Sequence, residues 1–309
     1  MTKIMNIDPT ELASKLAEVA DGEVHTNKSL APYTSYKIGG PTAIWVAPTT
    51  EAAVGRVLNA IHAAETPLFV LGRGSNTLVS DKGWNGVTLY LGENLSGWTF
   101  KNREADVWAG TRLIDLVRRT VEKGLAGLEL LAGIPGGVGG ALRMNAGAFG
   151  QEIESSAVSV GGFKRNGSSL RIDGDDIDFR YRGAPALDNM IITSGRFRFE
   201  RFAAADLKKR MEDVLALRTK KQPLKFPSCG SVFKRPAGYY AGALIEEAGM
   251  KGKRIGGALV SRKHAGFILN VANASAADVY ALIRTIEERV FERFGVRLER
   301  EVKLIGKFD

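Results

Sequence analysis

The order of the predicted elements indicates an α+β protein built from more than one domain. Helix and buried strand alternate near the start of the chain, short β-like runs fill its middle, and helices return in the last third. Alternating elements are typical of α/β layers, whereas strands beside separate helices are typical of α+β domains. With 309 residues, the chain exceeds what one hydrophobic core ordinarily organises, so two or three domains are expected.

Two helices and one strand are predicted in the first part of the chain. Asp8 is a suitable N-cap, with Pro9 at the first helical position and Glu11 three residues after the cap. Thr50 opens a second helix whose apolar residues recur at helical spacing. The apolar run Pro67–Gly72 has the length and composition of a buried strand.

The middle of the chain is predicted to mix helix and strand. A helix over Thr111–Lys123 ends at Gly124, a residue type that favours helix C-termini. Between residues 106 and 199 lie three β-like runs, DVWAG, SAVSVGG and MIITSGRFRF. A polar, charged helix over residues 203–220 is predicted to bridge to the last third.

Two further helices and a terminal strand are predicted beyond that bridge. One helix covers residues 239–248. The other begins at Ser275, with Asp278 in the capping-box position, and ends at Gly295. The run VRLEREVKLIG, residues 296–306, is predicted as the final strand.

Composition restricts the class of protein. The hydrophobic fraction is 44%, the charged fraction is 25%, and no apolar run approaches the roughly 20 residues of a membrane span. Because the N-terminus shows no apolar signal region, we expect a cytoplasmic protein without membrane association. The single cysteine, Cys229, excludes an intrachain disulfide, and three histidines without ligand spacing predict no metal site.

The net charge of +9 points to an anionic partner. Charge alone does not choose between a ligand that carries a diphosphate and RNA. No RNP-like aromatic motif or helix-turn-helix signal appears. We therefore expect no nucleic acid partner, and a monomer or weak oligomer.

Glycine is concentrated in two segments that are predicted to approach a ligand closely. Gly72–Asn76 follows the buried strand, and Gly133–Gly150 is denser in glycine than an ordinary helix or strand tolerates. Such backbone can turn successive N–H groups toward an anion, although tight turns at strand ends are the alternative. A Rossmann fingerprint is not met, because Thr77 and Leu142 stand where it needs a small residue. P-loop and GxSxG motifs are absent as well.

Six segments carry a resemblance to one enzyme family. They are TSYKIGGPT (Thr34–Thr42), LGRGSNTLVSD (Leu71–Asp81), GLELLAGIPGGVGGALRMNAGAFG (Gly127–Gly150), FRYR (Phe179–Arg182), KQPLKFPSCGSVFKRP (Lys221–Pro236) and GVRLEREVKLIG (Gly295–Gly306). In this order they resemble the UDP-N-acetylenolpyruvoylglucosamine reductases of bacterial cell-wall precursor synthesis, over nearly the whole chain. Broader FAD oxidases of the vanillyl-alcohol-oxidase type share the two glycine segments but not the later ones.

The resemblance implies a domain plan. We expect an FAD-binding region of the vanillyl-alcohol-oxidase type in two subdomains, residues 1–95 and 96–202, followed by a smaller α+β substrate domain, residues 203–295. The C-terminal run 296–309 is a candidate to return to the first subdomain. The short chain resembles the subclass that lacks a tyrosine-bearing loop over the substrate.

The resemblance also implies the reaction. NADPH is the co-substrate that reduces a bound FAD. The enolpyruvyl ether of UDP-N-acetylglucosamine then receives hydride at its vinyl terminus and a proton at the adjacent carbon, which gives UDP-N-acetylmuramate for peptidoglycan. Another FAD-dependent oxidase or dehydrogenase of the same superfamily is the alternative, and a non-enzymatic nucleotide- or RNA-binding protein is a third.

Three residues match the catalytic positions of the family. Arg182 would hold the substrate carboxylate and stabilise the negative charge beside it. Ser231 would donate the proton, and Glu301, with a raised pKa, would supply or orient it. Without the resemblance, a surface strand arginine and a turn serine are the favoured interpretations of Arg182 and Ser231. An exposed strand glutamate is an equally good interpretation of Glu301. Glu299 would face the same side of that strand.

Further positions match the family's binding residues. The matching cofactor positions are Leu71, Gly72, Arg73, Gly74, Ser75, Asn76, Thr77, Gly133, Ile134, Pro135, Gly139, Gly140, Asn145, Ala146 and Gly147. The matching substrate positions are Tyr181, Lys221, Lys234 and Glu247. The two lysines would lie near the diphosphate or carboxylate of the substrate.

The chain departs from the family pattern at three places. Cys229 stands where alanine is common, Gly266 stands where asparagine is common, and Gly183-Ala184 follow FRYR where a serine is usual. None of these changes removes a matched catalytic group. A thiol beside the site predicts greater sensitivity to thiol reagents.

Overall fold

The computed structural model describes residues 8–308, and the chain forms two compact units. The first unit contains the residues up to Asn27, Ala43–Arg73 and Asn85–Leu217. The second unit contains Lys28–Thr42, Gly74–Trp84 and the residues from Arg218 onward. The predicted division at residues 95, 202 and 295 stays a prediction.

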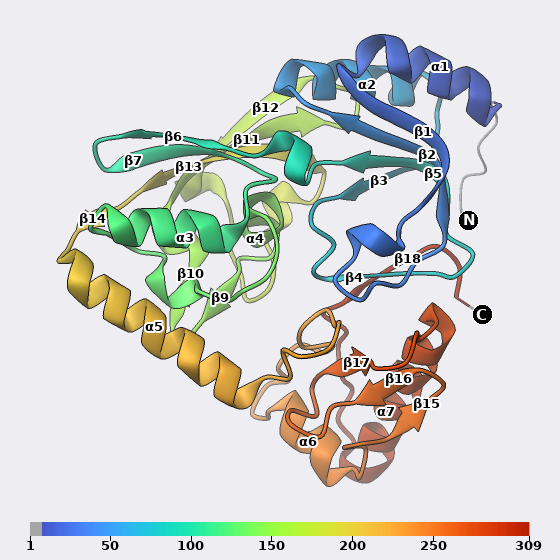
Figure 1. The fold of residues 1–309 in the computed structure, drawn as a ribbon, viewed down its shortest axis with the longest axis vertical. Coiled ribbons are helices and arrows are strands. Elements are labelled where there is room, and N and C mark those ends of the chain that lie inside the picture. The colour runs from blue at the N-terminus through green and yellow to red at the C-terminus, as the bar shows by residue number, and fades with distance from the viewer. Residues whose placement is uncertain (1–7, 309) are drawn as a thin grey trace. The chain divides into compact units, whose positions relative to one another are not determined.

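A four-stranded sheet and two helices form the first layer. The strand order is β1 (Gly22–Ser29), β2 (Pro41–Pro48), β5 (Trp84–Tyr90) and β3 (Leu68–Leu71), with β3 parallel to β5. Helices α1 (Pro9–Val19) and α2 (Glu51–Ala63) contact each other and lie on the same side of this sheet (Figure 1). Leu16 and Val57 on these helices are fully buried in one core with Ile44 of the sheet.

Both predicted helix starts in this layer are confirmed. The Asp8 carboxylate accepts a hydrogen bond from the backbone N–H of Thr10 at 2.8 Å, and the Thr50 hydroxyl accepts one from the residue three positions on. These bonds satisfy N–H groups that have no partner inside the helix. Glu11 pairs with Lys15 one turn later instead of closing a capping box.

The second layer is a five-stranded antiparallel sheet. Its order is β12 (Ser169–Asp173), β11 (Ala157–Lys164), β13 (Met190–Arg198), β7 (Glu104–Trp108) and β6 (Trp98–Lys101). The three β-like runs predicted from the sequence are β7, β11 and β13, which are adjacent in this sheet. Helices α3 (Leu113–Glu122) and α4 (Val138–Arg143) share its core, and α5 (Ala204–Lys221) adds Leu207 and Val214.

Short elements connect these layers. Two-residue strands form the pairs β8 (Leu125–Ala126) with β14 (Glu200–Arg201) and β9 (Gly147–Ala148) with β10 (Gln151–Glu152). Single 3-10 turns occur at Ala31–Tyr33, Glu93–Leu95, Glu129–Leu131, Ile153–Ser156, Gly174–Asp176 and Pro185–Leu187.

The second unit has its own core. Helices α6 (Ala241–Glu247) and α7 (Ala276–Phe294) pack with the antiparallel strands β15 (Arg254–Ile255), β16 (Ala258–Val260) and β17 (Ile268–Asn270). The predicted capping box of α7 is confirmed, since Ser275 and Asp278 exchange backbone and side-chain bonds. Gly295 ends the helix at a φ of 68°, a conformation that glycine adopts without strain.

The predicted final strand is mostly wrong. Only β18 (Lys303–Ile305) is a strand, and it pairs in parallel with β4 (Thr77–Val79). Before it, the carbonyl of Val232 accepts the N–H groups of both Glu301 and Val302. Arg300 forms only an isolated antiparallel bridge with Phe233, and the doubled bond interrupts a regular ladder. Residues 299–302 therefore pair with the loop around Val232 without forming a strand.

Other predicted boundaries differ by about two residues. Helix α3 begins at Leu113 and is followed by Gly124 at a φ of 64°. Across residues 8–308, no helix is both long and apolar enough to pass through a membrane. Within the same range, no cluster of three His, Cys, Asp or Glu side chains could hold a metal ion.

Candidate active site

The first glycine loop, Gly72–Asn76, follows β3, and its backbone N–H groups have no hydrogen-bond acceptor among the described residues. Within the described part of the chain, none of the five N–H groups of this loop donates a hydrogen bond. At Gly72 an added Cβ would meet nothing within 4 Å, so this side of the loop is open. Adjacent unpaired N–H groups are a binding surface for an anion such as a diphosphate.

Gly74 fixes the shape of this loop. Its φ is +59°, and an added Cβ would lie 2.2 Å from the carbonyl oxygen of Tyr33. The Gly74 carbonyl also accepts the N–H of Ser35 at 3.0 Å. A side chain here would strain the backbone and collide with the neighbouring segment, so only glycine is compatible with this geometry.

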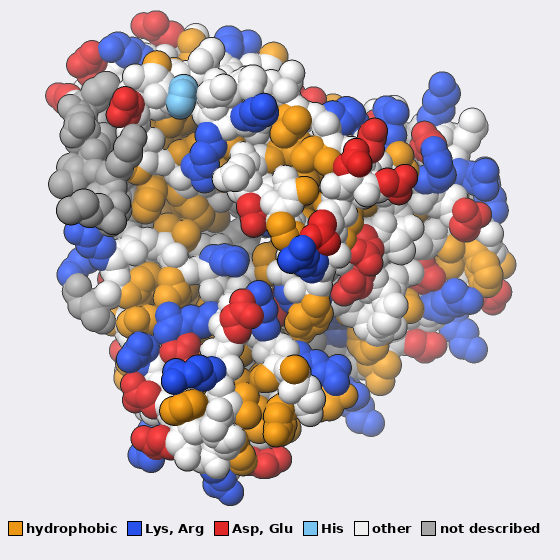
Figure 2. Space-filling model, turned by 180° about the vertical axis from the view of Figure 1, so that it is seen from behind, with side chains coloured by type: hydrophobic (Ala, Val, Ile, Leu, Met, Phe, Trp, Pro, Cys, Tyr) orange, Lys and Arg blue, Asp and Glu red, His pale blue; other side chains and the backbone are white. Residues whose placement is uncertain are grey.

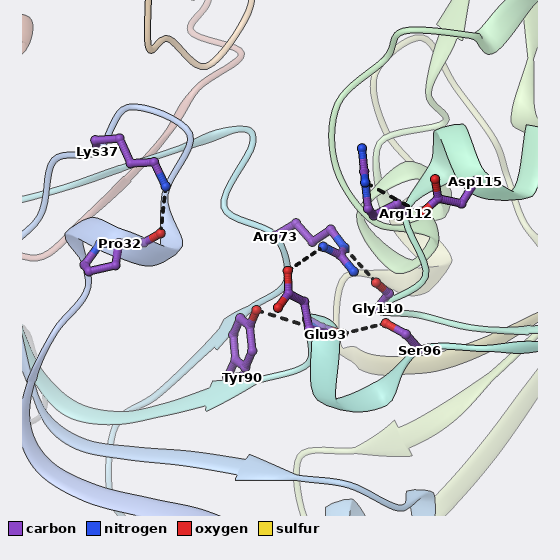
Figure 3. Close-up of polar contacts among 10 residues, drawn as sticks. Pro32, Lys37, Arg73, Tyr90, Glu93, Ser96, Gly110, Arg112 and Asp115 are labelled. Atoms are coloured by element: carbon purple, nitrogen blue, oxygen red, sulfur yellow. Dashed lines mark hydrogen bonds and ion pairs between the residues drawn. The ribbon is translucent and has the colours of Figure 1, made fainter.

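Arg73 turns its side chain to protein groups (Figure 3). Its Nε donates to the Gly110 carbonyl at 2.8 Å, and its Nη1 pairs with Glu93 at 3.2 Å. The arginine side chain is 18% exposed and the glutamate 78%, so the ion pair stabilises by only about 0–1 kcal/mol. Arg73 therefore anchors the loop, and its predicted contact with the cofactor stays a prediction.

The second glycine loop, Gly133–Gly150, packs its backbone against the segment that Arg73 also holds. The N–H of Gly139 donates to the Ala109 carbonyl at 2.9 Å, and an added Cβ would lie 2.7 Å from the Ala109 Cβ. Gly140, the next residue, is exposed with nothing within 4 Å of an added Cβ. Its N–H donates to no group among residues 8–308. Gly140, in the first turn of α4, thus presents an open backbone donor.

The end of the second glycine loop is held by Asn145. This residue is 1% exposed and has a φ of 39°. Its Nδ2 donates to Glu152 at 3.0 Å and to Glu154 at 2.9 Å, and its Oδ1 accepts the Glu154 N–H at 3.4 Å. The side chain is thus occupied by the protein itself, and its predicted contact with the cofactor stays a prediction.

Arg182 lies in a turn, not in a strand. Two backbone hydrogen bonds of 2.9 and 3.1 Å join Arg180 and Gly183 and close this turn. Arg182 has a φ of 57°, a conformation that costs a non-glycine residue on the order of 1 kcal/mol. Its Nη2 donates to the Gly147 carbonyl at 3.1 Å, and its guanidinium lies 4.9 Å from the ring centroid of Tyr181. The turn therefore fixes a cation over the second glycine loop.

Ser231 and Glu301 are brought together by Val232. Ser231 forms an antiparallel bridge with Phe267, and the Val232 carbonyl accepts the Glu301 N–H at 2.8 Å. Asn76 of the first glycine loop donates from Nδ2 to the Glu301 carbonyl at 3.0 Å. Three positions that the sequence predicts as site residues thus share one backbone network in the second unit.

Glu299 is distinguished from Glu301 by its ion pair. Lys234 Nζ lies 2.5 Å from Glu299 Oε1, and the Lys234 N–H donates to the Glu299 carbonyl at 2.8 Å. The remaining predicted substrate residues, Lys221 and Glu247, are exposed last residues of α5 and α6. Across the described chain, neither of their side chains makes a hydrogen bond or ion pair.

The comparisons with known proteins agree with this geometry. The FAD binding domain family matches residues 42–172, and the C-terminal domain family of UDP-N-acetylenolpyruvoylglucosamine reductase matches residues 222–305. The reductase of Syntrophomonas wolfei is 39% identical over 92% of this chain and 95% of its own length. The chain belongs to the UDP-N-acetylenolpyruvoylglucosamine reductase family. The predicted α+β order, with an FAD-binding region before a substrate domain, is confirmed.

Two further relatives support the assignment to this reductase family. The reductase of Oceanobacillus iheyensis is 40% identical over 96% of this chain and 97% of its own length. The crystal structure of the reductase from Thermus caldophilus has a TM-score of 0.76 and 34% identity, and the match covers 92% of this chain and 99% of that one. A different FAD oxidase is therefore set aside. An RNA-binding protein is set aside too, and Figure 2 shows Lys and Arg side chains interspersed with Asp and Glu on the face it presents.

The glycine loops of this family member fit an FAD. Gly72 and Gly140 leave open space where any other residue would place a side chain, and the N–H groups beside them have no acceptor within residues 8–308. Open backbone donors of this kind match the oxygens of a dinucleotide diphosphate. The residues present therefore suit the cofactor that the family match names.

Cys229, one of the three departures from the family pattern, is buried in the core of the second unit. It is 5% exposed, and burial raises the pKa of its thiol to about 12, with Glu301 adding to the shift and the Tyr36 hydroxyl opposing it. That hydroxyl lies beside the thiol and is itself fully buried. Because the thiolate is the reactive form, the expected sensitivity to thiol reagents is not supported.

Sequence reasoning missed two structural supports of the site. The carbonyls of Ala109 and Gly110 accept hydrogen bonds from both glycine loops, from the N–H of Gly139 and the side chain of Arg73. In the sequence these two residues are only the end of an ordinary β-like run. His264 lies beside the Ser231 segment, and its only signal in the sequence was its place two residues before Gly266, a departure from the family pattern. In both cases the function comes from a long-range contact that no local pattern records.

Proposed function

We propose that this chain reduces the enolpyruvyl ether of UDP-N-acetylglucosamine to UDP-N-acetylmuramate with NADPH, using bound FAD, in peptidoglycan precursor synthesis. The observation that carries the proposal is the backbone network at Val232, which joins Ser231 and Glu301. This network joins the backbones of the two residues, and on this proposal the hydroxyl would be the proton donor and the carboxyl would orient or reload it.

FAD would be held by the two glycine loops. The open N–H groups of Gly72–Asn76 suit its diphosphate, and Gly140 and Gly147 shape the surface beside it. When bound, FAD accepts hydride from NADPH and transfers it to the substrate. Arg73 and Asn145 would act indirectly, because their side chains hold the two loops in place.

Arg182 would stabilise the charge that develops beside the substrate carboxylate. A guanidinium is permanently charged and can bind a carboxylate with two parallel hydrogen bonds. The closed turn and the Gly147 carbonyl keep it in place before the substrate arrives. A preorganised cation of this kind lowers the energy of the transition state more than that of the ground state.

Ser231 would then give the proton to the carbon adjacent to the site of hydride transfer. A serine hydroxyl is a weak acid, so it needs a neighbour that polarises or reprotonates it. Glu301 is the neighbour that the backbone network provides, and its raised pKa stays a prediction. Lys234, with Lys221, would attract the substrate diphosphate, while Glu247 and Tyr181 would contact other parts of the sugar nucleotide.

The remaining predictions belong to this proposal. We infer an enzyme of the subclass without the tyrosine loop, working in the cytoplasm as a monomer or weak oligomer. The absence of a membrane-spanning helix among residues 8–308 is compatible with that location.

The direct test follows NADPH oxidation at 340 nm with and without the enolpyruvyl UDP-sugar. We expect oxidation that depends on the sugar nucleotide and yields UDP-N-acetylmuramate. A protein that binds FAD but shows no substrate-dependent turnover would refute the proposal.

Ser231→Ala separates the two half-reactions. We expect NADPH to bleach the flavin band of this variant at the normal rate, because hydride transfer to the flavin does not need the hydroxyl. Product formation should fall by roughly 10²–10⁴-fold, the range for a general acid. If flavin reduction itself failed, the role of Ser231 as proton donor would lose its support.

A further inference from the structure

His264 is a half-buried histidine held in a slot between two glycines. An added Cβ would lie 3.2 Å from the His264 Cε1 if placed on Gly242, and 3.0 Å if placed on Gly266. The ring also meets Phe267 edge-on, with 5.0 Å between ring centroids. Because both glycines lack side chains, the imidazole fits at this point and has little freedom to turn.

One hydrogen bond fixes the tautomer of this ring. The backbone N–H of Gly266 donates to His264 Nδ1 at 3.1 Å. Nδ1 is therefore an acceptor, and the neutral ring carries its proton on Nε2. Burial lowers the pKa of His264 and outweighs the opposing effects of a bond to the residue's own backbone and of Glu246, so the neutral form prevails at pH 7.

The same glycine connects the ring to Ser231. The carbonyl of Gly266 accepts the N–H of Val232 at 2.9 Å, and the next residue, Phe267, is the bridge partner of Ser231. An added Cβ on Gly266 would lie 3.8 Å from Ser231 Oγ. The imidazole and the hydroxyl thus both lie beside Gly266, whose N–H bonds to the ring and whose carbonyl bonds to the N–H of Val232.

We propose that His264 is a positioning residue for Ser231, because its Nδ1 holds the N–H of Gly266, whose carbonyl in turn holds the backbone that follows Ser231. The inference rests on the proposed function, since it concerns the proposed role of Ser231. Gly266 stands where the family commonly has asparagine, so position 266 offers no side chain that could replace the contact with the ring.

The first experiment compares His264→Ala, His264→Asn and the matched control His62→Ala, an exposed histidine on α2. Stopped flow on the FAD-loaded protein measures flavin reduction by NADPH and reoxidation by the enolpyruvyl UDP-sugar separately. For His264→Ala we expect reoxidation to slow by roughly tenfold, the scale of a small misplacement, with reduction unchanged. His264→Asn should recover most of the rate, because its amide oxygen can accept the Gly266 N–H. His62→Ala should match the wild type.

A double variant shows whether the histidine acts through the serine. If it does, His264→Ala should cause no further loss of reoxidation rate in a Ser231→Ala background. A full tenfold loss in that background would overturn the inference. Equal slowing of both half-reactions by His264→Ala, without recovery in His264→Asn, would overturn it as well.

The ring itself gives a readout that needs no turnover. Nitrogen NMR of the histidine-labelled protein should show His264 with an unprotonated Nδ1 and a protonated Nε2, and Gly266→Ala should disturb that pattern. A proton on Nδ1 in the wild type would refute the positioning contact. Absence of substrate turnover with the expected tautomer would instead count against the proposed function, so the two failures are distinguishable.

Discussion

The two glycine loops differ in what their backbones do. In Gly72–Asn76 the N–H groups make no hydrogen bond within the described chain, whereas in Gly133–Gly150 several N–H groups are used by the protein, as at Gly139 and Asn145. The first loop is therefore a surface of donors. The second is a shaped support whose positions are fixed by neighbours, and Arg182 is attached to it. Glycine density by itself does not distinguish these two roles.

Among changes at the two glycine loops, the largest effect is expected at Arg182, the cation held by the second loop. Arg182→Ala should lower the rate of the substrate half-reaction by about 10²–10³-fold, the cost of losing one preorganised stabiliser of developing charge. Flavin reduction by NADPH should be little changed. Arg182→Lys is the matched variant, and it should recover only part of the rate because an ammonium cannot bind a carboxylate with a planar fork. An unchanged stopped-flow reoxidation rate in Arg182→Ala would remove this residue from the site.

Gly74→Ala tests the backbone geometry of the first glycine loop. The substitution forces a methyl group toward the Tyr33 carbonyl at a φ of +59°. We expect a loss of about 2–4 kcal/mol in the free energy of unfolding and weaker FAD retention, because strain and overlap add. Chemical denaturation and flavin content after gel filtration measure the two effects. A variant as stable as the wild type would contradict the described loop.

Asn145 tests whether the second glycine loop depends on side-chain contacts. Asn145→Gly keeps the positive φ but removes the bonds to Glu152 and Glu154, so the loss combines these bonds with the greater backbone entropy of glycine in the unfolded chain. We expect a loss of about 1–3 kcal/mol in the free energy of unfolding, the cost of leaving buried polar partners unsatisfied. Asn145→Ala should lose somewhat more, because alanine also resists this backbone conformation.

Gly72→Ala should have the smallest effect on stability. It tests most directly whether the open N–H groups of the first glycine loop bind FAD. Its methyl group would enter open space, so the free energy of unfolding should change by less than about 1 kcal/mol. FAD affinity should nevertheless fall, by roughly tenfold, because the methyl group occupies the side on which the donors are open. Isothermal titration of the flavin-free protein with FAD checks this. Unchanged affinity would show that FAD does not approach this side of the loop.

Much of the fold was predictable because its signals are local. Capping residues and apolar spacing located α1, α2 and α7, and β-rich runs located β7, β11 and β13. The strand predicted over residues 296–306 failed because Val232, about 70 residues away in the chain, takes two of its N–H groups. No propensity within that run records such a partner.

By itself the sequence determined the family, the α+β class and the two segments in which glycine is concentrated. These follow from ordered motifs and from backbone rules that act within a few residues. Tertiary structure alone decided what each loop does. It left the N–H groups of Gly72–Asn76 without acceptors, and it engaged the side chains of Arg73 and Asn145 in hydrogen bonds within the protein. It also placed Ser231, Glu301 and His264 around one backbone network. The reason is physical: hydrogen-bond partners are chosen by proximity in the folded chain, and a motif cannot show whether a donor is already satisfied.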